Sequence, residues 1–142
     1  MGEQGPLEVG QTITSAPRRL SRQACMAFAR EFDPQPMHVD EVAAKDGFFG
    51  TLTASGWHAL AVTMRMAVDA RPFGDHPLLG AGIKELRFSR PILPDTDIAA
   101  RLTFEATETG RGAYSFDILF VETIDVPTSN VLIKQHWRIL RQ

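Results

Sequence analysis

A long apolar segment near the middle of the chain places the strongest constraint on its fold. Residues 57–70 read WHALAVTMRMAVDA, a run rich in helix-forming residues that has to end before Pro72. Arg65 is the only charge before Asp69, so apolar side chains would cover most of the circumference of this helix. A helix of that kind has to be buried on most sides. It is too short to cross a membrane, so the rest of the chain has to supply its cover.

The second half of the sequence carries strand patterns that can supply this cover. A strand is predicted over residues 82–90, GIKELRFSR. Residues 98–105 then alternate between apolar and polar side chains, the period of a half-buried strand. Two further strands are predicted after the turns TGRG and DVPTSN, and such short connections favour antiparallel neighbours. The alternating apolar sets are Ile98, Ala100, Leu102 and Phe104, then Tyr114, Phe116, Ile118 and Phe120, then Val131, Ile133, Trp137 and Ile139.

Cap residues mark two shorter helices in the first half. Ser21 precedes RQACMAFARE, and that helix has to end before Pro34 because the residue before a proline avoids the helical region. Asp40 precedes EVAAKD, and Gly47 is a suitable stop signal behind it. Residues 8–14 can form a short first strand.

These elements predict an α+β fold in a single domain over residues 1–142, in which an antiparallel sheet curls round one long helix. A sheet of this size leaves an edge strand and one face that need cover.

Composition narrows the class of partner. Apolar residues make up 44% of the chain and charged residues 23%, as in an ordinary globular protein. The net charge of -2 and the pI near 6.1 give no support for nucleic acid or an anionic membrane as the main partner. Cys25 is the single cysteine, which excludes an intrachain disulfide. The first residues lack a basic segment followed by an apolar run, so we expect a cytoplasmic protein.

The segment FDPQPMHVD, residues 32–40, is the strongest candidate for a chemical site. It carries Asp33 and His38 around two prolines, and each proline fixes one φ angle. If the path of the chain bends, the two side chains can flank one small cavity. The spacing alone equally allows Asp33 to cap a turn and His38 to be partly exposed. No further ligand clusters near His38 and Asp40, so no metal site is predicted.

This segment, together with FFGTLTASGWHALAVTMRM, resembles the MaoC-like acyl dehydratases, the (R)-specific enoyl-CoA hydratase group of the hot-dog superfamily. The family signature is an aspartate, any residue, asparagine, proline, any residue and histidine, which Asp33, Pro36 and His38 match in register. The Phe-Gly pair at 49–50 and the Ser-Gly turn at 55–56 also match. The sequence departs from the family at Phe32, where glycine is common, at Gln35, where asparagine is usual, and at ASGW, where a His-Gly-Met turn is more usual. The resemblance implies a hot-dog fold.

The resemblance also implies an activity, the reversible hydration of a 2-enoyl-CoA or the dehydration of an (R)-3-hydroxyacyl-CoA in fatty acid metabolism. One group has to take a proton from water and one has to deliver a proton to carbon. An imidazole can do either near neutral pH, and a carboxylate can orient the water. The resemblance assigns these roles to Asp33 and His38, with coenzyme A as part of the substrate and no other cofactor. It further implies a homodimer or a higher homo-oligomer, with CoA across the dimer interface.

Several other residues receive weaker assignments. The resemblance gives Gly56 the oxyanion role, through a backbone N–H at the start of the long helix. A glycine chosen only for loop geometry is the alternative. Ser55 is a predicted helix N-cap that can also touch the substrate. The candidates for a pocket wall are Phe48, Phe49 and Trp57, and the candidates for CoA phosphate contacts are Lys84, Arg87 and Arg90, which a solvated strand face would explain equally well.

Two other functions compete with the hydratase. A hot-dog thioesterase would also place a carboxylate near a thioester, but it would have no use for a fixed His38. A non-catalytic acyl-CoA-binding subunit is suggested by the departures at Phe32 and Gln35. Fold analogy alone does not choose among these functions.

Overall fold

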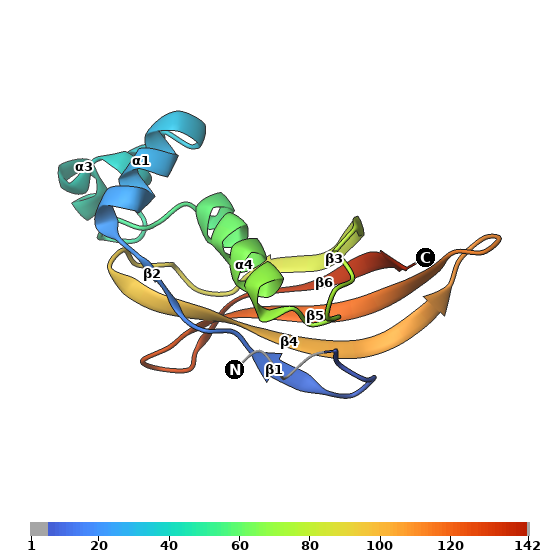
Figure 1. Ribbon diagram of the computed structural model, residues 1–142. Coiled ribbons are helices and arrows are strands. Elements are labelled where there is room, and N and C mark those ends of the chain that lie inside the picture. The colour runs from blue at the N-terminus through green and yellow to red at the C-terminus, as the bar shows by residue number, and fades with distance from the viewer. Residues whose placement is uncertain (1–5, 142) are drawn as a thin grey trace.

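The structure is a computed structural model that describes residues 6–141, so residues 1–5 and 142 of the expected single domain lie outside the described part. Its helices are α1 (Arg22–Phe32), α2 (Pro36–Val39), α3 (Glu41–Lys45) and α4 (Gly56–Ala70). Its strands are β1 (Thr12–Thr14), β2 (Arg18–Leu20), β3 (Gly80–Phe88), β4 (Thr96–Thr109), β5 (Ser115–Asp125) and β6 (Val131–Arg141). Figure 1 shows α4 lying across one face of the sheet, with α1 to α3 projecting beyond one end of it.

The described strands form one antiparallel sheet in the order β1-β4-β5-β6-β3, with β2 also pairing to β4. The three long strands β4, β5 and β6 follow one another through the two short turns that the sequence indicates. Strand β3 pairs only with β6 and therefore forms an edge of the sheet. This arrangement is the hot-dog fold, and it confirms the predicted α+β class.

The predicted helix caps are present. The Ser21 hydroxyl accepts from Ala24 N–H at 3.1 Å, and the Asp40 carboxylate accepts from Val42 N–H at 3.0 Å and Ala43 N–H at 3.1 Å. These bonds satisfy backbone donors that the first turn of a helix leaves unpaired. The long helix begins one residue earlier than expected, and neither the single turn of α2 nor the short strand β2 was predicted.

One face of α4 packs on the sheet through small side chains. Its buried residues are Ala59, Thr63, Met66 and Ala67, which recur at the spacing of one helical face. Of these, Ala59, Met66 and Ala67 share an apolar core with Ala100, Leu102, Leu119, Val121 and Ile133 from the three long strands. Two alanines on the helix and one on the sheet allow the backbones to approach closely.

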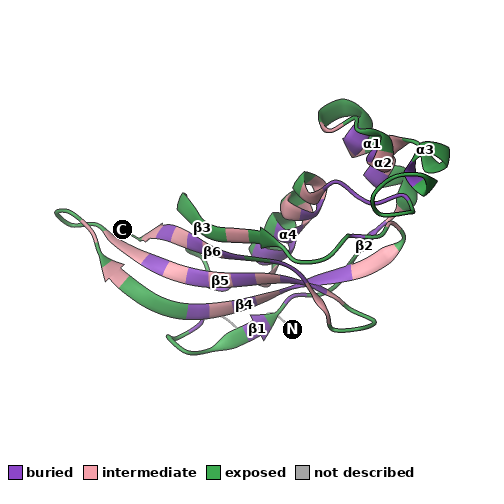
Figure 2. Ribbon diagram, turned by 180° about the vertical axis from the view of Figure 1, so that it is seen from behind, coloured by how far each residue is buried: buried purple, intermediate pink, exposed green. Residues whose placement is uncertain are grey.

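The other side of α4 is not covered, which corrects the expectation of a helix buried on most sides. Trp57 is 63% exposed, Met64 40% and Val68 50% (Figure 2 shows the mixed burial of this helix). A single sheet can cover only one side of a helix, so the apolar residues on the far side need another surface.

The apolar residues Phe116, Ile118 and Phe120 lie on the face of β5 opposite α4, where they are half-buried. The core face of this strand instead carries Leu119 and Val121. The side chains of Arg138 and His136 on the neighbouring strand β6 cover the outer aromatic rings. The guanidinium of Arg138 lies 3.5 Å from the ring centroid of Phe116, and the His136 ring stacks on Phe120 at 4.7 Å. The same two side chains pair with Glu108 and Glu105 of β4, so charged groups shield the outer face from water.

No helix within residues 6–141 combines the length and the hydropathy that crossing a bilayer would require.

A buried hydroxyl pair between α4 and β5 gives a stability prediction. The Thr63 hydroxyl donates to the Ala59 carbonyl at 2.7 Å and lies 2.6 Å from the Thr123 hydroxyl. Because Thr63 has already used its only proton, Thr123 has to be the donor in that pair. Thr63→Val should therefore leave a buried donor without a partner and cost about 1–3 kcal/mol of unfolding free energy, whereas Thr123→Val should cost less than about 1 kcal/mol.

Urea unfolding of the two single variants and the double variant measures this difference. The double variant should be more stable than Thr63→Val alone, because it removes the unpaired donor. Equal costs for the two single changes would contradict the assignment of the donor.

Candidate active site

A bend in the chain after α1 brings Asp33 and His38 together. Asp33 is the C-cap of α1, and its N–H donates to Ala29 O at 2.9 Å. Pro36 then opens α2, a single helical turn in which proline is well tolerated at the first position. This turn directs His38 back toward Asp33, so that His38 Nε2 lies 3.4 Å from Asp33 Oδ2. Of the two possibilities that the sequence allows, the structure therefore favours Asp33 and His38 side by side over a turn with an exposed His38.

The His38 ring is buried and has a defined orientation. Its Nδ1 lies 2.7 Å from the Thr53 carbonyl oxygen, and a carbonyl can only accept a hydrogen bond. Nδ1 therefore carries a proton, and Nε2 is the ring nitrogen that faces Asp33. Thr53 is held in turn, because its N–H donates to Met37 O at 2.9 Å.

The Asp33 carboxylate is held by two side-chain donors. Gln35 Nε2 donates to Oδ1, and the Ser55 hydroxyl donates to Oδ2 at 2.7 Å. The Gln35 bond is the largest influence and holds the pKa of Asp33 below its usual range; partial burial opposes this effect, while Ser55 and His38 add to it. Asp33 is therefore ionised at neutral pH and serves as an acceptor.

Ser55 connects this carboxylate to the long helix. It is fully buried, and its hydroxyl accepts from Trp57 N–H at 3.2 Å, which confirms the predicted N-cap of α4. The same hydroxyl donates to Asp33, so Ser55 lies behind the carboxylate rather than in the wall of the hollow.

Gly56 is the first residue of α4 and lines the same hollow as Asp33 and His38. Its N–H donates to no acceptor among residues 6–141, as expected for a donor in the first turn of a helix. A Cβ at this position would lie 2.4 Å from Cε1 of Phe88. Glycine is therefore required in part because the Phe88 ring packs against the helix start.

The hollow in front of the pair has a volume of about 230 Å³ and a largely apolar wall. Phe49 and Trp57, two of the predicted wall residues, line it. Phe48 does not: its side chain is 96% exposed and meets Phe49 edge to face at 5.1 Å. The sequence-based assignment of Phe48 is therefore wrong, because the loop turns its ring away from the hollow. The remaining apolar wall comes from Met37, Ala54, Phe88, Pro91 and Ile92.

The three predicted basic residues do not gather at one point. Arg90 lines the hollow and also a neighbouring one of about 300 Å³, so it stands where the two adjoin. Lys84 and Arg87 lie on the edge strand β3, opposite His136 and Lys134 of β6. Only Arg90 therefore borders the candidate site.

Two residues that hold the Asp33 and His38 side chains were not assigned a role from the sequence. Thr53 acts through its backbone carbonyl, which no residue pattern reveals. Gln35 was visible only as a departure from the family signature, and its contact with Asp33 needed the structure.

His58 is next to the site in sequence but has a structural role. Its ring stacks on Phe28 of α1 at 4.8 Å, and burial lowers the pKa of His58. The neutral ring therefore joins α1 to α4.

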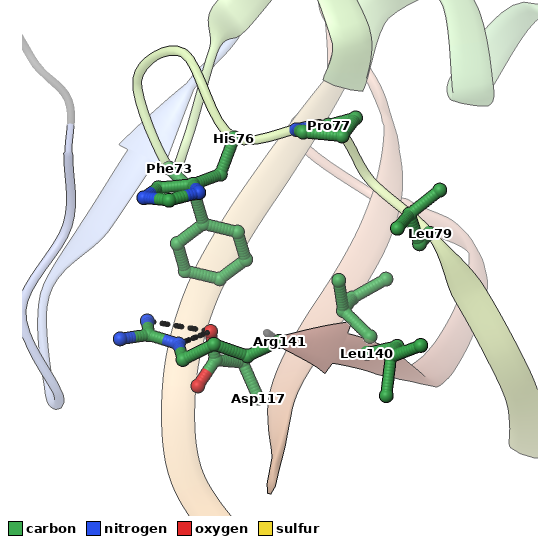
Figure 3. Close-up of a pocket in the computed structure, with 8 residues that line it drawn as sticks. Phe73, His76, Pro77, Leu79, Asp117, Leu140 and Arg141 are labelled. Atoms are coloured by element: carbon green, nitrogen blue, oxygen red, sulfur yellow. Dashed lines mark hydrogen bonds and ion pairs between the residues drawn. The ribbon is translucent and has the colours of Figure 1, made fainter. Parts of the chain in front are cut away.

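A second hollow, beyond the C-terminal end of α4, is shown in Figure 3. Its volume is about 70 Å³, and it contains the buried carboxylate of Asp117, paired to Arg141 Nη2 at 2.6 Å. Thr107 also donates to Asp117 at 3.2 Å. Because these charges compensate each other and the space is small, this hollow is the weaker candidate for a substrate site.

Among residues 6–141, no group of three or more histidine, cysteine, aspartate or glutamate side chains is placed to hold a metal ion.

The hot-dog fold defines the class of this protein, and comparison with known sequences agrees with this class. Residues 6–119 match the MaoC like domain, so the chain belongs to the MaoC-like dehydratase family. Protein YdeM of Bacillus subtilis (strain 168) is 34% identical over 90 residues, which are 63% of this chain. The chain spans 64% of the length of YdeM.

Solved structures show the same fold. The MaoC-like dehydratase from Rhodospirillum rubrum is 34% identical and superimposes with a TM-score of 0.86, covering 94% of this chain and 92% of that one. The (R)-hydratase from A. caviae involved in PHA biosynthesis has a TM-score of 0.75 and covers 94% and 96% of the two chains. At 18% identity, that second likeness shows the fold alone.

The packing of Phe88 on Gly56 gives a prediction for a double-mutant cycle. Gly56→Ala should cost about 1–3 kcal/mol of unfolding free energy, since the new methyl group displaces the ring. In a Phe88→Ala background the same change should cost almost nothing, because the ring is absent. Thermal unfolding of the four proteins gives the coupling energy, and additive effects would show that the ring is not the obstacle.

Proposed function

We propose that the protein catalyses the reversible hydration of a 2-enoyl thioester, or the dehydration of an (R)-3-hydroxyacyl thioester, with coenzyme A as the carrier. The observation that carries this proposal is the 3.4 Å approach of His38 Nε2 to Asp33 Oδ2 at the wall of a hollow that Gly56 also lines. Membership of the MaoC-like dehydratase family supports the reaction class. No metal or redox cofactor is needed for this chemistry.

In the hydration direction His38 is the base. The Nε2 lone pair takes one proton from a water molecule while the water oxygen forms a bond to Cβ of the enoyl group. The imidazolium then gives this proton to Cα, so water is added across the double bond and His38 returns to its neutral form. Asp33 stays ionised, orients the water and stabilises the imidazolium.

The thioester carbonyl gains negative charge during this step and needs a donor. The unpaired N–H of Gly56 lies at the N-terminus of a 15-residue helix, where the helix dipole favours negative charge. We assign it the oxyanion role. A fixed donor of this kind acts most strongly when the charge develops.

The apolar wall formed by Phe49, Trp57 and Phe88 suits an acyl chain, and Arg90 is the candidate contact for the phosphates of coenzyme A. The departures from the family signature leave the pair intact. Phe32 is 66% exposed, and Gln35 bonds to Asp33 instead of displacing it. These contacts count against the binding subunit that the two departures suggested.

Variants of the pair test the proposal directly. Asp33→Asn and His38→Ala should each lower the hydration rate by about two to four orders of magnitude, because each removes one member of the acid/base pair. The assay uses a panel of enoyl-CoA and acyl-CoA thioesters, with circular dichroism melts to confirm folding. Release of free coenzyme A from saturated thioesters would instead identify a thioesterase, and turnover of none would favour the binding subunit.

We also propose that the protein is a homodimer. Strand β3 is an edge with exposed apolar residues, among them Ile83 at 59% and Phe88 at 50%, and the uncovered side of α4 adds Met64 and Val68. An edge strand pairing with its copy would satisfy free backbone groups and cover these side chains.

Light scattering at micromolar concentration should give the mass of two chains. Ile83→Lys should shift the protein toward the monomer, since it places a charge in the contact. Val42→Lys is the matched control, because Val42 is 75% exposed on α3, away from this edge. A monomeric parent protein would exclude the dimer.

A further inference from the structure

We propose that Gln35 is a positioning residue for the reaction, and that its carboxamide holds the Asp33 carboxylate in place opposite His38. This inference rests on the proposed function and extends it to a side chain that departs from the family signature.

Gln35 contacts both members of the pair. Its backbone N–H donates to Asp33 O at 2.8 Å, and its backbone carbonyl accepts from His38 N–H at 2.9 Å. Its side chain reaches back to donate to Asp33 Oδ1. One residue therefore links the carboxylate to the turn that carries the imidazole.

The local backbone leaves this side chain free for the contact. Gln35 is the N-cap residue of α2, with φ of -85° and ψ of 149°, but its side chain makes no capping bond. The flanking Pro34 and Pro36 have fixed φ angles, which limits the paths open to the segment. The carboxamide is thus directed toward Asp33 and not toward the helix it precedes.

The side-chain donors of Gln35 and Ser55 bind different oxygens of the Asp33 carboxylate. Gln35 occupies Oδ1, while Ser55 and the His38 ring face Oδ2. With both oxygens held, rotation about the last side-chain torsion is blocked, and Oδ2 is the oxygen that meets the water. Without Gln35 only the Ser55 bond would remain, and the carboxylate could turn away from the imidazole.

The charge of Asp33 depends on the same contact. The Gln35 bond has the largest influence among those that keep the pKa of Asp33 low, and His38 is the titratable group that faces it. A carboxylate that loses a donor becomes easier to protonate. Loss of Gln35 should therefore raise the pH at which the Asp33 carboxyl group takes up a proton.

Three variants separate positioning from a merely structural role. Gln35→Met keeps the length of the side chain without the donor. Gln35→Glu replaces the donor by a second carboxylate, which should raise the pKa of Asp33 further. Gln23→Met, on the exposed surface of α1, is the control for the same exchange away from the site.

The first measurement is the steady-state rate of hydration. Gln35→Met should lower kcat by up to about 100-fold, the order of loss for a misplaced catalytic group, with KM changed less than about two-fold. Gln23→Met should retain the kcat and KM of the parent protein.

The second measurement does not depend on activity. Carbon-13 NMR of the Asp33 carboxyl group follows its titration in each folded variant, so it tests Gln35 even if the parent hydrates no thioester and the proposed function fails. A higher Asp33 pKa in Gln35→Met, and a still higher one in Gln35→Glu, supports the inference. An Asp33 titration unchanged in folded Gln35→Met overturns it, even if the melting temperature is lower.

Discussion

The buried hydroxyl of Ser55 is the interaction on which both the fold and the site depend. It accepts from Trp57 N–H and so caps α4, and it donates its single proton to Asp33. The start of the central helix and the carboxylate are therefore fixed relative to each other by one oxygen atom. Gly56 is the next residue in the chain. The bond between Ser55 and Asp33 therefore also brings the free N–H of Gly56 close to the Asp/His pair.

The sheet supports this arrangement from one side only. Small side chains on α4 let the helix lie close to β4 and β5, and the Thr63–Thr123 bond adds a polar contact within the apolar interface. On the opposite face of the sheet, the side chains of Arg138 and His136 cover aromatic rings of β5. The far side of α4 and the edge strand β3 lack such cover. Their exposed apolar residues form a surface that is suited to contact with another apolar surface.

Local patterns were predictable where neighbouring residues decide the structure. The caps at Ser21, Asp40 and Ser55 depend on residues a few positions apart, and all are present. The alternation in β4 is present from Ala100 to Phe104, whereas Ala99 is buried as well. The prediction was incomplete where residues far apart decide it. Alternation in β5 identified two faces, but only packing against α4 selected Leu119 and Val121 for the core. The exposure of Phe48 depends likewise on the path of a loop.

The sequence by itself determined the fold class, the central helix and the residue types of the candidate pair. Hydrophobic periodicity, cap chemistry and a family signature depend only on which residues stand at which positions. The tertiary structure alone decided that Asp33 and His38 meet, that the Thr53 carbonyl orients the imidazole, and that Gln35 and Ser55 hold the carboxylate. It also placed the Phe88 ring against Gly56. Most of these contacts join residues well separated in the chain or use backbone atoms, which every residue possesses, so no local pattern carries them.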